Sequence, residues 1–355
     1  MQPNQQKLIS AAPALRKALL GWFMKHQRPM PWRQKISAYR TVVSELMCQQ
    51  TQIATATPYF ERWVARWPDF KALAKASESD VLKLWAGLGY YSRARNLLRL
   101  AKEVSQLKET PRTAEAWQQY PGVGPYTAAA IASIAFREPV AVVDGNVIRV
   151  LARLTGYRAL MKNGVTAARY FTPLANQLVA AQSPGDFNQA IMELGATVCR
   201  KASPDCSACP LSRWCVAKAQ KTTALIPKFE TKKRTVQQVH RALIMKDRKI
   251  LLHRQDSQAR RLAGVAEIPD IQNLNIKTKT APVFVKRRTI GQVTYEENLI
   301  VLKLNKSVQQ SIHRSAQCEW VDVDQLDDAA VSGPHRRWLA EWLSLSDQPK
   351  LGRRT

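Results

Sequence analysis

Acidic residues are scarce in this chain of 355 residues. Only 27 residues are Asp or Glu, against 54 Lys or Arg, which gives a formal net charge of +27 at pH 7 and a pI near 10.2. Such an excess repels itself and is uncommon in a globular enzyme of small metabolites. A polyanionic partner explains it best, and nucleic acid is the leading candidate. A basic surface that serves only solubility is the weaker alternative.

Long apolar runs are absent as well. No stretch approaches the ~20 apolar residues that a membrane span needs, and the start, MQPNQQKLISAAPALRKALL, shows neither a signal-peptide layout nor an evident transit peptide. We therefore expect a soluble, non-secreted, cytoplasmic protein without membrane contact. The length favours two domains, and 45% hydrophobic residues suffice for sizeable cores.

Cysteine is rare, with six in the chain, but four of the six lie in CRKASPDCSACPLSRWC, residues 199–215. Thiols of a large intracellular chain stay reduced, so this density favours a metal centre over disulfides. Four thiolates suit zinc or a [4Fe–4S] cluster, and the spacing alone leaves both open. The candidate ligands are Cys199, Cys206, Cys209 and Cys215. The isolated Cys48 and Cys318 are expected to be structural.

The periodicity of apolar residues changes once along the chain. Residues 1–222 have a helical pattern, with apolar positions three and four apart, and the polar stretch KTTALIPKFETKKRT at 221–235 follows as a linker. Strand-like runs come next, with a turn predicted at 247–249. They are VHRALIMK, RKILLHR, APVFVKR and NLIVLKL. A helical stretch, HRRWLAEWLSL, precedes a basic tail at 346–355. We predict an all-α domain over 1–220 and a smaller α+β domain over 236–345.

A Gly-rich turn lies within YPGVGPYTAAAIASIAF, residues 120–136. With a helix predicted before it and an Ala-rich helix after it, this segment is a helix–hairpin–helix. Glycines let backbone N–H groups approach a phosphate, and the following helix N-terminus favours an anion. An ordinary helix–helix corner is the alternative, which the net charge disfavours. The candidate phosphate contacts are Gly122, Val123, Gly124 and Thr127.

Two carboxyl groups are candidates for chemistry. Glu45 lies in SELMCQQTQ among apolar neighbours, which should raise its pKa toward the range of a general acid. A solvated helical face is the commoner fate of such a residue. Asp144 follows an apolar run and precedes a helix, so it is also a natural N-cap. Gln49 and Gln50 belong to a polar cluster suited to base edges.

Taken together, six motifs resemble the MutY-type adenine DNA glycosylases of the helix–hairpin–helix superfamily. The motifs are SELMCQQTQ, GLGYYSRARNL, PGVGPYTAAAI, VVDGNVIRVLAR, FNQAIMELGA and the four-cysteine segment. They lie in the family's order over residues ~20–220. The resemblance implies that the four cysteines carry a [4Fe–4S] cluster. It also implies a base excision repair enzyme, acting as a monomer on duplex DNA with A:8-oxoguanine or A:G mispairs.

The resemblance also implies individual roles. Glu45 would protonate the departing adenine, and Asp144 would stabilise the sugar cation, as paired carboxyl groups do in glycoside hydrolysis. Tyr126 and Asn146 match positions that support this step. The flipped adenine would be lined by Trp32, Arg33, Gln189 and Glu193. The gap left in the duplex would be filled by Gln50 and one of Tyr90 and Tyr91.

Lysine is absent between Lys108 and Lys162. Bifunctional relatives attack the sugar with a lysine after the hairpin, where this chain has Tyr126. Without a nearby amine to form a Schiff base, the enzyme is expected to be monofunctional.

The second domain resembles the MutT-like (Nudix-like) domain of the same family. It lacks the Glu-rich pyrophosphohydrolase box, so no nucleotide hydrolysis is expected. The family reads 8-oxoguanine with a Phe-Ser-His-like loop, and RRTIGQVTYEENLIV at 287–301 has Ile290, Gly291 and Gln292 there. The alignment leaves Thr294 and Tyr295 in the loop as well. Ile290 and Gln292 are the candidate contacts to the opposite base.

Two other functions remain as alternatives. A mismatch thymine or uracil glycosylase of the same superfamily could share the tyrosine, the aspartate and the cluster, but Glu45 in its setting and the second domain disfavour it. A DNA-scanning protein without catalysis could use the hairpin and the basic charge. The presence of both Glu45 and Asp144 disfavours that reading.

Overall fold

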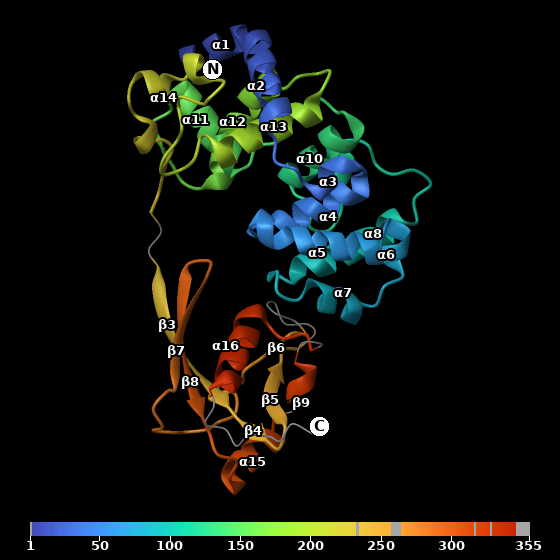
Figure 1. The fold of residues 1–355 in the computed structure, drawn as a ribbon, viewed down its shortest axis with the longest axis vertical. Coiled ribbons are helices and arrows are strands. Elements are labelled where there is room, and N and C mark those ends of the chain that lie inside the picture. The colour runs from blue at the N-terminus through green and yellow to red at the C-terminus, as the bar shows by residue number, and fades with distance from the viewer. Residues whose placement is uncertain (1, 232–233, 257–263, 316, 327–328, 346–355) are drawn as a thin grey trace. The chain divides into compact units, whose positions relative to one another are not determined.

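The computed structural model describes residues 2–231, 234–256, 264–315, 317–326 and 329–345 (Figure 1). The basic tail predicted at 346–355 lies outside them. The chain forms two compact units: Met1–Lys75 with Asn96–Thr231, and Ala76–Arg95 with Lys232–Thr355. The second unit therefore includes a segment, 76–95, that the sequence pattern assigns to the helical domain.

The first unit is helical, as predicted. Its helices are α1 (Pro3–Ser10), α2 (Ala12–His26), α3 (Pro31–Gln34), α4 (Ala38–Cys48), α5 (Ile53–Arg66), α6 (Phe70–Ala74), α9 (Ala114–Trp117), α10 (Pro125–Phe136), α11 (Gly145–Thr155), α12 (Gly164–Leu178), α13 (Pro184–Thr197) and α14 (Val216–Ala219). Helix α8 (Ser92–Val104) begins in the second unit and continues into the first. Two short parallel strands, β1 (Leu160–Met161) and β2 (Lys228–Phe229), pair with each other.

The predicted helix–hairpin–helix is formed by α9, a tight turn and α10. Thr113 caps α9 by accepting from the Ala116 N–H at 3.2 Å. Gly122 in the turn has φ +79°, and a Cβ there would lie 2.8 Å from the Cβ of Asn96. Only glycine satisfies both constraints, so the turn's sequence determines its shape.

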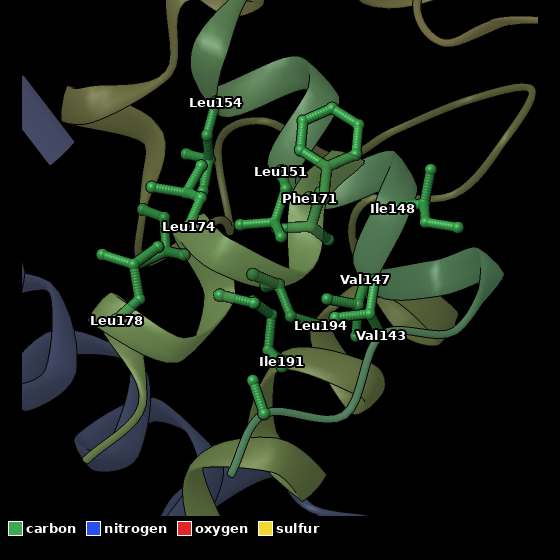
Figure 2. Close-up of a cluster of buried hydrophobic side chains, with 14 of the residues drawn as sticks. Val143, Val147, Ile148, Leu151, Leu154, Phe171, Leu174, Leu178, Ile191 and Leu194 are labelled. Atoms are coloured by element: carbon green, nitrogen blue, oxygen red, sulfur yellow. The ribbon is translucent and has the colours of Figure 1, made fainter. Parts of the chain in front are cut away.

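Helices α11, α12 and α13 pack around one apolar core (Figure 2). Helix α11 begins at the Asp144 N-cap and ends at Gly156 in the left-handed conformation, the start and stop signals that its sequence contains. Its apolar side chains, among them the fully buried Leu151, contact Phe171 of α12 and Leu194 of α13. This core fixes the position of Asp144 at the start of α11.

The second unit contains two sheets and several helices. One sheet has the order β3 (Thr235–Leu243), β8 (Val293–Val301), β7 (Phe284–Ile290), with β8 parallel to β3 and antiparallel to β7. The other contains β4 (Met245–Lys246), β5 (Lys249–Arg254), β6 (Ala266–Glu267) and β9 (Cys318–Asp322). The helices are α7 (Glu78–Trp85), α15 (Lys306–His313) and α16 (Gly333–Ser344). A sheet-containing C-terminal region is thus confirmed.

The predicted turn after the first strand-like run is present, because Met245 pairs with Ile250 and Lys246 with Lys249 across a two-residue turn. None of the helices in the described ranges combines the length and apolarity that a membrane crossing requires.

Buried charges tie the second unit's sheets together. Glu297 of β8 accepts from Arg241 and from Arg288, each at 2.6 Å. Arg288 also lies 2.9 Å from Glu267, which faces the buried His335 at 3.1 Å. Burial raises the pKa of Glu267, but His335 and the two arginines outweigh it and hold that pKa far below its ordinary value. The network keeps these carboxylates ionised without access to water.

Candidate active site and cysteine-lined cavity

Glu45 and Tyr126 meet between two helices of the first unit. The Tyr126 hydroxyl donates to Glu45 Oε2 at 2.6 Å, and also contacts the sulfur of Met192 at 3.7 Å. Burial raises the pKa of Glu45 from 4.5 to about 7; the bond from Tyr126 and the charge of Arg33 lower it, and the charge of Asp144 raises it further. The predicted raised pKa is present, and it places Glu45 near its own titration midpoint at neutral pH.

Asp144 shares this environment. Its Oδ1 accepts from the Val147 N–H at 2.8 Å, which caps α11, and its Oδ2 accepts from Asn146 Nδ2 at 2.8 Å. Burial raises the pKa of Asp144, while these bonds and the charge of Arg149 oppose the rise. The predicted N-cap is therefore present, and it leaves the candidate chemical role of Asp144 as a prediction. Asp144 contributes to the raised pKa of both Glu45 and Tyr126, so the three groups form one electrostatic site.

Arg149 also belongs to this hydrogen-bonded site, although the sequence did not single it out. Its Nη2 donates to Asn146 Oδ1 at 2.8 Å and to Gly195 O at 2.6 Å, and its Nε donates to Cys199 O at 2.7 Å. Hydrogen bonds thus run from Asp144 through Asn146 and Arg149 to the backbone of Cys199. The sequence contains one signal for this contact, because Arg149 follows Asn146 by one helical turn and so lies beside it on the helix surface.

The predicted base-pocket residues form a second network. Arg33 donates to Gln189 Oε1 at 3.0 Å and to Glu193 Oε2 at 3.1 Å. Arg28, which the sequence reasoning missed, donates to Glu193 through both its backbone N–H and its guanidinium, at 3.0, 2.7 and 3.1 Å. Burial raises the pKa of Glu193, but these bonds and the charge of Arg33 outweigh it and lower the pKa. Trp32 packs edge-on against Phe60.

The candidate contacts at α4 and the hairpin have different surroundings. Gln49 Nε2 donates to Thr127 Oγ1 at 3.2 Å, and Thr127 is buried. Val123 is also buried, and its N–H donates to Tyr120 O at 3.2 Å. Gly122 and Gly124 are exposed. A phosphate contact is therefore favoured at the two glycines rather than at Val123 or Thr127.

Two of the three candidate wedge residues, Gln50 and Tyr90, have unusual backbones. Gln50 has φ +55° and Tyr90 has φ +47°, a region that only a few per cent of non-glycine residues adopt. Gln50 is exposed, and Tyr90 of the second unit is 47% exposed. Tyr91 is buried, and its hydroxyl donates to Val331 O at 3.2 Å. Of the two tyrosines, the geometry thus favours Tyr90.

The four clustered cysteines line one surface cavity with Arg153 and Lys218. Burial, together with the charges of the other three cysteines, raises the pKa of Cys209 to about 11, so the four thiols lie within electrostatic reach. Arg153 is buried, and its Nη1 donates to Cys199 Sγ at 3.3 Å and to Arg200 O at 2.8 Å. Among the described residues, no group of three or more His, Cys, Asp or Glu side chains is arranged to hold a metal ion.

In the second unit, the loop predicted at 290–292 is a hairpin turn. Ile290 ends β7, Val293 begins β8, and the two residues pair with each other. Gly291, with φ +62°, and the exposed Gln292 form the turn. Thr294 and Tyr295 belong to β8 rather than to the loop, because the hairpin register continues through both.

The chain is similar to several known proteins. A family model described as "HhH-GPD superfamily base excision DNA repair protein" matches residues 43–171. The adenine DNA glycosylase of Rattus norvegicus is 47% identical over 220 residues, which cover 59% of this chain and 42% of that protein. The adenine DNA glycosylase of Homo sapiens is also 47% identical, over 221 residues, which cover 59% of this chain and 40% of that protein. That of Buchnera aphidicola is 33% identical over 231 residues, or 64% of this chain and 66% of that protein. The chain thus spans less than half of the mammalian relatives it matches.

Solved structures show the same fold. A thermostable thymine-DNA glycosylase is 25% identical with a TM-score of 0.52, covering 59% of this chain and 98% of that one. An endonuclease III–DNA complex matches 62% of this chain and 99% of its own with a TM-score of 0.50; at 18% identity it shows the fold alone. Residues 43–171, which include the hairpin and both candidate carboxyl groups, thus match the HhH-GPD superfamily of base excision DNA repair proteins, and the chain is similar in sequence to the adenine DNA glycosylases.

Proposed function

We propose that the chain is an adenine DNA glycosylase of base excision repair, which removes adenine paired with 8-oxoguanine or guanine. The observation that carries the proposal is the Glu45–Tyr126 bond of 2.6 Å in a site electrostatically coupled to Asp144. Two carboxyl groups with separate environments are what glycosidic cleavage requires. The sequence relatives support adenine as the base.

Glu45 is the proposed acid. With a pKa of about 7, its protonated form is populated at neutral pH and can donate a proton to the leaving adenine. Tyr126 orients the carboxyl group, since burial and the charges of Glu45 and Asp144 raise its own pKa well above the ordinary value and keep its hydroxyl a donor. The proton improves the leaving group, and the glycosidic electrons depart with the base.

Asp144 is the proposed partner of the sugar cation. Its capping bonds hold the carboxylate at the start of α11, where a negative charge faces the helix dipole favourably. Asn146 fixes the second oxygen. Water then supplies the hydroxyl of the abasic sugar, and no lysine between Lys108 and Lys162 is present to divert the reaction into a lyase pathway.

Recognition of the base and of the duplex is proposed for the remaining residues. Trp32, Arg33, Gln189 and Glu193 line the extruded adenine, with Arg28 holding Glu193. Gln50 and Tyr90 fill the gap in the stack, and Gly122 and Gly124 approach a phosphate. The net charge of +27 supports duplex DNA as the partner of a monomeric, cytoplasmic enzyme.

A [4Fe–4S] cluster is the proposed cofactor, held by Cys199, Cys206, Cys209 and Cys215. The donor chemistry fits, because four thiols line one cavity beside the cationic Arg153. Four thiolates suit a single zinc ion as well as a [4Fe–4S] cluster, and the family resemblance favours the cluster. When bound, the cluster would cross-link the segment after α13.

The second domain is proposed to be MutT-like and to read the base opposite adenine. Its hairpin turn carries Ile290, Gly291 and Gln292 in place of the family's Phe-Ser-His-like residues. An apolar wedge and an amide remain available there, and a hydroxyl and an imidazole are missing. We propose domain limits of 1–220 and 236–345, with the linker at 221–235.

An alkaline nicking assay tests the function. Single-turnover reactions on duplexes with A:8-oxoguanine, A:G, G:T and G:U should show strand breaks only with the two adenine pairs. Breaks at G:T or G:U instead would establish the thymine or uracil alternative, which the fold likeness to the thymine-DNA glycosylase keeps in consideration. Binding without any break would establish a scanning protein.

A further inference from the structure

The loop between α7 and α8, residues 87–90, contains three residues with positive φ, and one of them, Tyr90, is not a glycine. Gly87 has φ +106°, Gly89 has φ +69° and Tyr90 has φ +47°. A side chain such as that of Tyr90 remains in this region only where the surroundings determine the conformation. The loop nevertheless presents Tyr90 with 47% of its surface exposed. Some element of the second unit must therefore hold the loop in shape.

Arg93 is the residue that holds this loop. It is 7% exposed, and its Nη2 donates to Leu88 O and to Gly89 O, both at 3.0 Å. Its guanidinium carbon lies 5.3 Å from the ring centre of Trp85 and 5.5 Å from that of Tyr90. One nitrogen of the guanidinium thus binds two carbonyls of the loop, while the planar group contacts the rings of Trp85 and Tyr90, and a lysine ammonium cannot reproduce these stacked contacts.

Two neighbours fix the rest of the loop. Trp85 Nε1 also donates to Gly89 O, at 3.0 Å. Tyr91 points inward, and its hydroxyl bond to Val331 O ties the residue after Tyr90 to the segment that precedes α16. Tyr91 is therefore buried, whereas its neighbour Tyr90 is 47% exposed.

We propose that Arg93 is a positioning residue that presents Tyr90 to the duplex. The inference rests on the proposed function, in which Tyr90 fills the space left by the extruded adenine. Arg93 acts through the loop and the Tyr90 ring, and not by contacting the reacting atoms. Its removal should therefore matter only while Tyr90 is present.

A double-mutant cycle in the full chain tests this dependence. Arg93→Met and Tyr90→Ala should each lower the single-turnover rate of adenine excision by about tenfold, and the double variant should stay within about threefold of Tyr90→Ala because the two residues are coupled. Arg93→Lys, which keeps the charge but not the planar group that contacts the two rings, should behave like Arg93→Met. A 2-aminopurine beside the mispair should show less unstacking with all of these variants.

Arg95→Met is the matched control, because Arg95 lies on the same helix and pairs with Glu78 at 2.6 Å. The loss of excision rate caused by Arg95→Met should multiply with the loss caused by Tyr90→Ala in the double variant. The proposal fails if the rate losses of Arg93→Met and Tyr90→Ala also multiply, so that the double variant loses about 100-fold in excision rate. It fails as well if Arg93→Lys excises adenine at the wild-type rate. If Arg93→Met does not fold, Arg93→Lys carries the cycle. Wild-type protein inactive on adenine pairs would refute the proposed function instead, and the 2-aminopurine signal would still test Arg93.

Discussion

The Tyr126 hydroxyl donates to Glu45 Oε2 across 2.6 Å, although 81 residues separate the two in sequence. Helices α4 and α10 bring them together. The bond opposes the effect of burial on Glu45: desolvation favours the neutral acid, and the phenol favours the carboxylate. The balance leaves the pKa of Glu45 at about 7, which suits an acid at neutral pH.

The raised pKa of Glu45 predicts a pH-dependent effect on stability. A carboxyl whose pKa rises from 4.5 to about 7 on folding contributes stability below pH 4.5 that is lost as pH rises toward 7. Glu45→Gln avoids this loss. The free energy of unfolding of this variant should exceed that of wild type by on the order of 1–3 kcal/mol at pH 8 and by much less at pH 5, as measured by urea unfolding. Glu61→Gln, which removes a carboxyl group at an exposed position on α5, serves as the control. Equal stability of wild type and Glu45→Gln at pH 8 would contradict the shift.

Tyr126→Phe should move the alkaline limb of the pH–rate profile. Since the phenol lowers the pKa of Glu45, its removal should raise that pKa, so the limb shifts above pH 7. The maximal rate should fall as well, because the carboxyl loses its orienting bond. Single-turnover rates between pH 5 and 9 measure both effects. A limb that shifts to lower pH would show that Tyr126 does not stabilise the carboxylate.

Asp144 allows its capping and chemical roles to be separated. Asp144→Asn keeps a good N-cap but removes the negative charge, so it should fold normally, bind duplex and lose excision by at least about 100-fold. Asp144→Ala should lose excision too, and should also be less stable by about 1 kcal/mol. Excision by Asp144→Asn at close to the wild-type rate would exclude the proposed role of the charge.

Local signals determined how much of this arrangement the sequence could predict. The Asp144 cap, the Gly122 turn and the Met245–Ile250 hairpin each depend on a few adjacent residues, and the sequence indicated all three. The contacts of Arg28 with Glu193 span 165 residues, and no periodicity reports such a pair. The buried Tyr91 bonds to Val331, 240 residues away, so the sequence could not choose between Tyr90 and Tyr91.

The cysteine segment predicts a coloured protein. Anaerobically purified chain should contain about four iron and four sulfide per molecule and absorb broadly in the visible range. Cys206→Ser should lower the iron content, and Cys318→Ser, in the second unit, should leave it unchanged. One zinc and no iron per chain would overturn the cluster assignment.

The hairpin at Gln292 predicts a weakened preference for 8-oxoguanine. Gly291 offers no hydroxyl and Gln292 offers an amide in place of an imidazole, and each lost hydrogen bond is worth roughly 0.5–1.5 kcal/mol. The ratio of A:8-oxoguanine to A:G excision should therefore be about tenfold lower than in relatives with the full Phe-Ser-His-like loop.

Because Gln292 is exposed in a two-residue turn, Gln292→Ala should fold normally and lower the ratio slightly further. Gln309→Ala, exposed on α15, serves as the control. If Gln292→Ala instead abolishes a strong preference, Gln292 has taken over the role of the histidine. If replacing Ile290 and Gln292 together leaves the ratio unchanged, this hairpin does not read the opposite base.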